Sequence, residues 1–175
     1  LLWPVDDPYG GPAAGYALDV QRQVMGRHDL IPISYAGRIS KIRGVVSVKE
    51  RLWGYHYMAG ANYTLMTREG NPPEDGSVDI GRGVSRYLQV ASGDSLGLRG
   101  NDGTLFQFEV REVLPATSEL VAADLIILSE KDFREFFALA GGLATDLAVS
   151  VRNPREVDTV AAKVAEMLPD TRPIL

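Results

Sequence analysis

The sequence contains no cysteine among its 175 residues. This absence excludes disulfide bonds, thiolate metal sites and thiol nucleophiles together. It does not fix the compartment, because a chain of this length can fold outside the cytosol without disulfides. No stretch approaches the ~20 consecutive apolar residues of a membrane-spanning helix. A basic stripe is also missing: the net charge is −5, with acidic and basic residues interleaved, which disfavours nucleic-acid binding.

The beginning of the sequence lacks both a methionine and a signal-peptide pattern. It reads Leu1-Leu2-Trp3, as we expect of a piece excised from or processed out of a longer chain. Residues 1–16 hold three prolines and three glycines around Asp6-Asp7. This composition predicts an irregular lead-in to the first element.

Motifs for nucleotide chemistry and for a nucleophilic serine are missing. The sequence has no G-x-x-x-x-G-K-[ST] loop, so we do not expect it to bind ATP in that way, and it has no G-x-S-x-G turn. Gly81-Arg82-Gly83 begins a G-x-G-x-x-G pattern, but Arg86 stands where the third glycine belongs. We interpret this segment as a turn before a short helix.

Polar residues that could carry chemistry are few and scattered. The two histidines, His28 and His56, have no further donors at the short spacing of a metal site. The serines at segment boundaries are explained by capping, and the acidic pairs by solvation in loops: Ser34, Ser92 and Ser129; Asp6-Asp7 and Glu74-Asp75. We therefore predict no catalytic, cofactor-binding or metal-binding residues, and no enzyme activity.

The first segment of structure has a β-α-β pattern. Leu18, Val20 and Val24 alternate with polar residues, which predicts a strand with one buried face. Ser34 is the expected cap of a helix that turns Ala36, Ile39 and Ile42 inward and ends at Gly44. Residues 45–57 are then expected to form one strand, or two with a kink at Gly54.

The last third of the chain returns to this pattern. Residues 125–128 form an apolar run typical of a buried strand, and Ser129 is the expected cap of a helix with Phe133, Phe136, Phe137 and Ala140 on one face. Leu147, Val149 and Val151 predict another strand. Asn153-Pro154 with Glu156 predicts the start of a helix that carries a stripe from Val157 to Leu168.

The middle of the chain is rich in predicted strands. We expect strands at residues 61–67 and 95–98, and a short helix with Val84, Tyr87, Leu88 and Ala91 on its inner face. Phe106, Phe108 and Val110 alternate with polar residues in a further strand. The predicted class is α+β: an α/β lobe made of two β-α-β-type segments, 17–57 and 124–175, with an inserted β-rich lobe at 58–123.

Three aromatic residues, Trp53, Tyr55 and Tyr57, recur at every second position. One interpretation places them in the core of a hairpin with Tyr63 and Leu65. The other makes them an exposed face for a partner, a hydrophobic ligand or the membrane surface. In that case Leu52, Met58 and Ala61 would serve the core instead. They are the candidate interaction residues of the chain.

The order of these elements resembles the periplasmic core domain of MacB-like and FtsX-like ABC-transporter permeases. The resemblance lies in the helix, Gly-Val and strand of residues 39–48, and in the short helix, Gly93-Asp94 and hairpin of residues 83–110. It continues through Ile126-Ile127-Leu128-Ser129, the Leu-x-Val-x-Val strand, Asn153-Pro154 and the end of the last helix at Met167-Leu168-Pro169. These motifs are glycine, turn and core positions; together they span residues 17–175.

The resemblance implies a domain on the periplasmic side of an inner-membrane protein, between two membrane helices. The domain would couple cytosolic ATP hydrolysis to export, lipoprotein release or control of a partner outside the membrane. The implied partners are the rest of the permease, a separate cytosolic ATPase, and a periplasmic adaptor or lipoprotein, with a dimer in the full-length protein. Apolar spans would then flank residues 1 and 175.

Two other functions compete with this interpretation. One is an extracytoplasmic ligand-binding or sensory domain that recognises a small molecule or peptide between its lobes. The other is a small β-barrel of a cytosolic enzyme, because a short helix, Gly-Asp and a hairpin also occur in double-psi barrels. The flanking α/β segments and the lack of polar clusters argue against the barrel.

Overall fold

The computed structural model describes residues 16–115 and 123–175, so the lead-in expected at residues 1–16 lies outside the described part except for Tyr16. The chain divides into two compact units. Unit 1 comprises Leu1–Arg51 and Gly141–Leu175, and unit 2 comprises Leu52–Ala140. The polypeptide therefore passes from one unit to the other twice.

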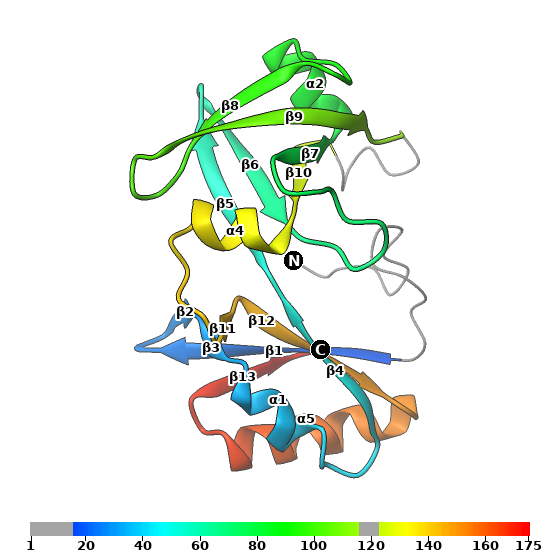
Figure 1. The fold of residues 1–175 in the computed structure, drawn as a ribbon. Helices are drawn as coiled ribbons and strands as arrows, with labels where there is room; N and C mark the ends of the chain where they lie inside the picture. The colour runs from blue at the N-terminus through cyan, green and yellow to red at the C-terminus, as the bar shows by residue number, and fades with distance from the viewer. Residues whose placement is uncertain (1–15, 116–122) are drawn as a thin grey trace. The chain divides into compact units, whose positions relative to one another are not determined.

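Unit 1 is built on a five-stranded sheet in the order β13-β1-β12-β4, with β2 paired to β1 (Figure 1). All neighbours in this sheet are antiparallel. A separate two-stranded sheet joins β3 and β11. The elements are β1 Tyr16–Val24, β2 Arg27–Asp29, β3 Ile31–Pro32, α1 Ser34–Ile39, β4 Val45–Arg51, β11 Leu143–Ala144, β12 Asp146–Val151, the 3-10 turn η1 Pro154–Glu156, α5 Val157–Met167 and β13 Thr171–Ile174.

One face of this sheet forms the core of unit 1. The register pairs Leu18 with Val149 and Val20 with Leu147, and all four side chains are fully buried. Helices α1 and α5 lie on the same side of the sheet (Figure 1) and bury Ile39, Val160 and Val164. The predicted alternation is confirmed for Leu18 and Val20 and for Leu147 to Val151, because the pleat sends every second side chain to this face. It does not extend to Val24, which is 38% exposed at the end of β1.

The ends of the helices in unit 1 differ in part from the prediction. Ser34 does not cap α1: the capping position is Ile33, with no side-chain hydrogen bond, and the helix ends at Ile39 instead of running to Gly44. Gly44 is still the left-handed residue of the following turn, with φ +98°. The side chain of Asn153 accepts a hydrogen bond from the N–H of Arg155, as predicted, but the first turn is 3-10 and α5 begins at Val157.

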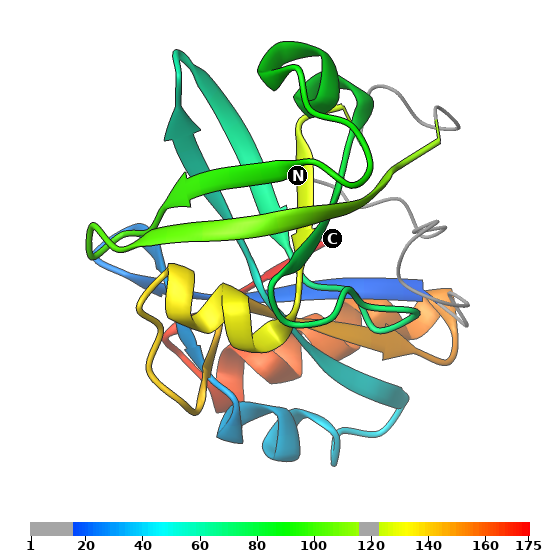
Figure 2. The ribbon, with the colours of Figure 1, turned by 45° about the horizontal axis from the view of Figure 1, so that its top comes forward.

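Unit 2 contains a six-stranded sheet in the order β5-β6-β10-β7-β9-β8. The pairs β6–β10 and β7–β9 are parallel and the others antiparallel. The sheet is strongly twisted, so that the β8–β9 hairpin crosses β5 and β6 steeply (Figure 2). The elements are β5 Trp53–Met58, β6 Ala61–Met66, β7 Ser77–Ile80, α2 Arg82–Leu88, β8 Ser95–Arg99, β9 Leu105–Val113, β10 Leu125–Leu128 and α4 Glu130–Phe136.

Helix α4 fills the core of unit 2 with aromatic side chains. Ser129 caps it as predicted, accepting a hydrogen bond from the N–H of Asp132. Phe133 and Phe136 are fully buried, and Phe136 contacts Phe106 of β9 with ring centroids 5.6 Å apart. The predicted inner face of α2 is correct only in part: Val84 is buried, but Tyr87 is exposed and the helix ends at Leu88, before Ala91.

The α+β class is confirmed, whereas the unit boundaries differ from those predicted. The expected α/β lobe included residues 52–57 and 124–140, but these lie in unit 2. The reason is strand pairing: β5 pairs with β6, and the apolar run Leu125–Leu128 lies between β6 and β7. The expected break at Gly54 is instead at Leu52, where the chain leaves the first sheet for the second.

Candidate functional site

Strand β5 carries the three aromatic candidate residues at one edge of the unit 2 sheet. Tyr55 is 53% exposed and Tyr57 is 69% exposed, while Trp53 is partly buried. In an antiparallel strand these alternate positions share one face. The hairpin-core interpretation is therefore wrong for Tyr55 and Tyr57. We define Trp53, Tyr55 and Tyr57 as the aromatic face of β5.

The opposite face of β5 explains why the aromatic face is turned outward. A Cβ atom built on Gly54 would lie 2.9 Å from Cζ of Phe137, so only glycine lets the helix segment approach this closely. His56 packs edge-on against Phe136, with ring centroids 4.9 Å apart. Burial lowers the pKa of His56. The small and partly buried residues of β5 thus face α4, and the large ones face away.

The aromatic face is ridged instead of flat. The rings of Trp53 and Tyr55 are 5.7 Å apart between centroids and inclined at 72°, an edge-to-face contact. Along β6 the same face continues with Met66 and Thr64, which pair with Trp53 and Tyr55 and are buried. On this face, the exposed side chains of β5 therefore lie beside the buried side chains of β6.

The tip of the β5–β6 hairpin is fixed to α2. The turn residues Ala59 and Gly60 have φ +51° and +82°, values typical of the tight turns that join antiparallel strands. The hydroxyl of Tyr87 donates a hydrogen bond to the carbonyl of Ala59 at 2.7 Å. The ring of Tyr87 also lies 6.5 Å from that of Tyr63 on β6. Tyr87, which the sequence suggested as a core residue, instead holds the hairpin in place.

The histidines do not meet in a metal site. Nε2 of His28 lies 2.8 Å from the carbonyl oxygen of Thr145, to which it donates, in unit 1. His56 lies in unit 2 beside Phe136. Among the described residues, no three His, Cys, Asp or Glu side chains gather closely enough to hold a metal ion.

An ion cluster lies on the helix-free face of the unit 1 sheet. The guanidinium of Arg51 contacts both oxygens of Asp146, at 2.6 and 2.7 Å, and reaches Asp19 at 2.8 Å. Asp146 is fully buried. Burial raises the pKa of Asp19, and repulsion by Asp146 adds to the rise while Arg51 opposes it. The same two carboxylates raise the pKa of Arg51 against the effect of its burial.

A second ion cluster, which the sequence did not suggest, anchors a loop in unit 2. Asp79 of β7 is fully buried and accepts hydrogen bonds from Arg68 and Arg111, each at 2.8 Å. Both guanidiniums also donate to the carbonyl of Asn71 at 2.9 Å. The two guanidiniums and the carboxylate of Asp79 together hold the loop after β6 to the sheet, which indicates a structural role.

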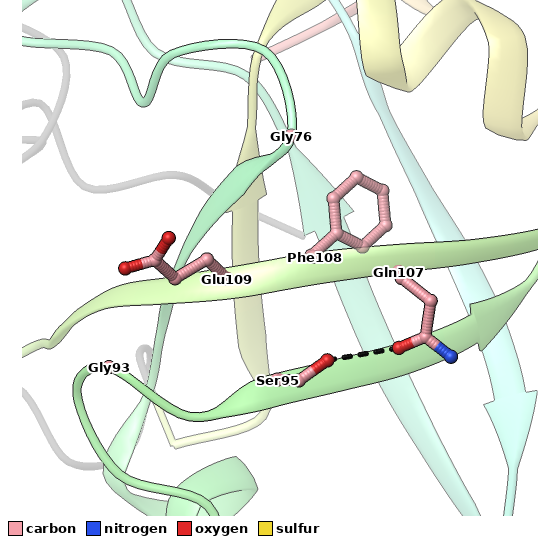
Figure 3. Close-up of a pocket in the computed structure, with 6 residues that line it drawn as sticks. All are labelled: Gly76, Gly93, Ser95, Gln107, Phe108 and Glu109. Carbon is pink, nitrogen blue, oxygen red and sulfur yellow. Dashed lines mark hydrogen bonds between the residues drawn. The ribbon is translucent and has the colours of Figure 1, made fainter.

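A shallow hollow of about 470 Å³ opens on the outer side of the β8–β9 hairpin (Figure 3). The side chains of Ser95 and Gln107 point toward one another there and form a hydrogen bond of 3.0 Å. Gly76, Gly93, Phe108 and Glu109 complete its lining. The hollow lacks convergent charged groups, so it resembles a surface depression more than a ligand site.

Comparison with known proteins finds relatives only in structure. No family model matches the sequence, and no curated protein sequence matches it. The periplasmic region of MacB from Actinobacillus actinomycetemcomitans superposes with a TM-score of 0.58 at 11% identity, over 90% of this chain and 87% of that one. The extracellular domain of the noncanonic ABC-type transporter YknZ from Gram-positive bacteria gives 0.56 at 10% identity, over 91% and 100%.

These two likenesses span both units. Within the described ranges, no helix has the length and apolar character needed to cross a membrane. The resemblance stated from the sequence is confirmed at the level of the fold: this chain has the fold of the extracytoplasmic domains of MacB-type ABC-transporter permeases.

Proposed function

We propose that this chain is the extracytoplasmic domain of an ABC-transporter permease and acts without catalysis of its own. It couples ATP hydrolysis by a cytosolic ATPase to export, to lipoprotein release or to control of a partner outside the membrane. The parent protein is held in the inner membrane, with this domain on the periplasmic side. The observation that carries the proposal is a fold shared over about nine-tenths of the chain with two such domains.

The two units of the domain have different roles in this proposal. Unit 1 contains the first and the last described strands, β1 and β13, and its sheet is backed by two helices, which suits it to connect to the rest of the permease. Unit 2 is inserted between its two parts and carries the aromatic face of β5. We assign this face, Trp53, Tyr55 and Tyr57, to contact with an adaptor or a lipoprotein, because exposed aromatic side chains are enriched at protein interfaces. The full-length permease would be a dimer.

The location is tested by cysteine labelling in the full-length protein. The chain has no cysteine, so Met25→Cys, at a residue 98% exposed, introduces a single reactive thiol into it. A maleimide that does not cross the inner membrane should label this site in cells with a permeable outer membrane. Ile39→Cys, at a fully buried position, is the matched control and should stay unlabelled. Labelling of Met25→Cys only after the inner membrane is broken would contradict the proposal.

The contact surface is tested by photo-crosslinking in living cells. A photoreactive phenylalanine at position 57 should form an adduct with another envelope protein. The same residue at position 105 is the control, because Leu105 is similarly exposed at 55% but lies on β9. Equal adducts at both positions, or none at position 57, would show that the aromatic face is not the contact surface.

A further inference from the structure

The backbone of β5 leaves hydrogen-bonding groups pointing out of the sheet. The N–H of Thr64, on β6, donates to the carbonyl of Asp124 and so points away from β5. Thr64 is paired with Tyr55, which makes this a non-hydrogen-bonded pair of the antiparallel ladder. The N–H and C=O of Tyr55 therefore point toward the open edge, and those of Tyr57 do so two residues later. Within the described part of the chain, they have no hydrogen-bond partner there.

The residues of β5 itself carry none of the usual features that block another strand. Edge strands are commonly blocked by charged residues, proline or a bulge. The residues Trp53–Met58 include no charge and no proline, and their register with β6 is unbroken over six pairs. The other edge strands of the two large sheets do carry such residues: Lys49, Glu50 and Arg51 on β4, Arg172 and Pro173 on β13, and Arg99 on β8.

The side chains beside this edge favour a peptide over a glycan. A sugar ring stacks on a flat aromatic platform, but Trp53 and Tyr55 are inclined at 72°. Strand pairing with a peptide needs no flat platform, and exposed aromatic rings can pack against the alternate side chains of an extended segment. An uncharged edge is complementary to an uncharged segment, because neither partner loses a solvated charge on pairing.

The area of the edge does not suit a second folded copy of this chain. The exposed parts of Tyr55 and Tyr57 amount to roughly 250 Å² per copy, from about 200 Å² for each whole side chain. A symmetric contact through these two residues would bury about 500 Å² in total, against the roughly 1,000 Å² of a specific interface. An extended segment can instead cover both the edge and the aromatic face.

We infer that β5 is a docking strand, to which a partner protein adds an extended, uncharged segment as a seventh strand of the unit 2 sheet. The segment bonds to the outward N–H and C=O groups of Tyr55 and Tyr57, and its alternate side chains pack against the aromatic face. This inference rests on the proposed function for the claim that the partner lies outside the cytoplasm. The docking itself is a property of the purified 175-residue chain and is tested there, whatever the topology experiment returns.

Hydrogen exchange tests the direction of the backbone groups in the free chain. The amides of Tyr55 and Tyr57 should exchange quickly, whereas that of His56, which points to β6, should be protected. The reverse pattern would overturn the inference before any ligand is added.

Peptide probes test the docking. A library of displayed random dodecapeptides is selected on the wild-type chain, and the strongest binders are synthesised. We expect uncharged sequences rich in β-branched and aromatic residues. Their binding should slow exchange at Tyr55 and Tyr57. Methylating the peptide N–H groups at alternate residues should weaken binding at least tenfold in one register and less than twofold in the other, because only one set faces β5.

A matched pair of variants separates backbone from side chain. Tyr57→Pro removes an outward N–H without breaking a bond to β6, as proline on an edge strand allows. It should reduce peptide binding more than Tyr57→Ala, which keeps the N–H and loses the ring. Because the N-methyl series uses the wild-type chain, the inference stays testable if Tyr57→Pro does not fold.

Four further results would overturn the inference. Selection could return no binder, or the binders could be insensitive to N-methylation in both registers. Chitohexaose could change exchange at Tyr55 and Tyr57, which would assign the face to glycans. Sedimentation could show that the chain alone associates with itself and that Tyr57→Pro abolishes this, which would make the occupant a second copy.

Discussion

The guanidinium of Arg51 forms two hydrogen bonds with the carboxylate of Asp146, Nε to Oδ1 at 2.6 Å and Nη2 to Oδ2 at 2.7 Å. Arg51 is the last residue of β4 before the chain enters unit 2, and Asp146 is the first residue of β12 after it returns. The N–H of Thr145 also donates to the carbonyl of Arg51 at 2.9 Å. The strands that precede and follow the inserted unit, β4 and β12, are thus joined at this end by both side chains and backbone.

Replacing Arg51 should destabilise unit 1 strongly. Arg51→Met leaves the buried carboxylate of Asp146 without its bidentate partner, and removing one member of a buried ion pair costs about 3 kcal/mol. Chemical denaturation measures the loss. The control is Arg152→Ala, which removes an exposed pair with Glu156 and should cost less than about 0.5 kcal/mol. Equal effects of the two variants would mean that the Arg51 pair contributes no more than a surface pair.

The ionisation of Asp19 should make stability fall as the pH rises. Its folded-state pKa is raised above 3.8, chiefly by burial, so the folded protein keeps a proton that the unfolded chain releases. Stability therefore falls as the pH rises from about 3.8 through the folded pKa. The stability of the wild type relative to Asp19→Asn should decline across this window, as measured by denaturation at stepped pH.

A carboxyl group with the opposite shift provides the control for Asp19. A hydrogen bond from the N–H of Thr104 lowers the pKa of Asp102, whose stabilising effect is present above 3.8 and lost as the pH falls through the folded value. The stability of the wild type relative to Asp102→Asn should therefore rise with pH below 3.8. Parallel pH profiles for the two variants would contradict the assignment for Asp19.

Two glycines in helices should respond oppositely to alanine. A Cβ on Gly83 of α2 would lie 2.5 Å from the carbonyl oxygen of Ala123, so Gly83→Ala forces a backbone shift and should cost about 2 kcal/mol. Gly37 of α1 has no atom within 4 Å of its Cβ position, so Gly37→Ala should gain about 0.5–1 kcal/mol. Thermal unfolding distinguishes them, and a stabilising Gly83→Ala would show that this contact is not tight.

Two tyrosines should likewise respond oppositely to phenylalanine. The hydroxyl of Tyr63 is buried and has no hydrogen-bond partner in the described part of the chain, so Tyr63→Phe should raise the free energy of unfolding by about 1 kcal/mol. The hydroxyl of Tyr35 donates to Asp170 at 2.9 Å, and Tyr35→Phe should lower the free energy of unfolding by about 1 kcal/mol. Denaturant midpoints give both values; a loss on Tyr63→Phe would reveal a partner for that hydroxyl.

The turn between β1 and β2 should be more stable with asparagine than with methionine at position 25. Met25 is 98% exposed and has φ +52°, a conformation that asparagine adopts more readily than methionine. Met25→Asn should therefore raise the free energy of unfolding by about 1 kcal/mol, and with it the melting temperature. Leu105→Asn, at an exposed strand position, should not. A lower melting temperature for Met25→Asn would mean that Met25 makes contacts that offset the strain.

Much of the secondary structure could be predicted because it is encoded locally. The alternation of Phe106, Phe108 and Val110, and the caps at Ser129 and Asn153, depend on neighbours within a few residues. The assignment of strands to sheets depends on distant partners instead. Leu125–Leu128 has the same apolar pattern in either unit, and only its pairing with β6 and β7 places it in unit 2.

The position of the candidate site could be predicted from the sequence, but whether its side chains face the core or the solvent could not. The period of Trp53, Tyr55 and Tyr57 shows that they share a face, not which face is covered. Gly54 was the available signal: a glycine on the alternate face allows a helix to approach, as Phe137 does. The buried cluster around Asp79 gave no signal, because Arg68 and Arg111 are distant in sequence and each is ordinary by itself.

The two crossings between the units have a mechanical consequence. They meet unit 1 at neighbouring strands: one follows Arg51 at the end of β4, and the other precedes Gly141, from which the chain runs through β11 into β12, the partner of β4. A pull on both crossings along the strand direction loads β4 and β12 together and does not slide one past the other. At the second crossing the pair of β11 with β3 takes the tension first. Once that pair opens, the ladder between β12 and β1 resists, and its hydrogen bonds are strained in shear and must break together instead of one by one.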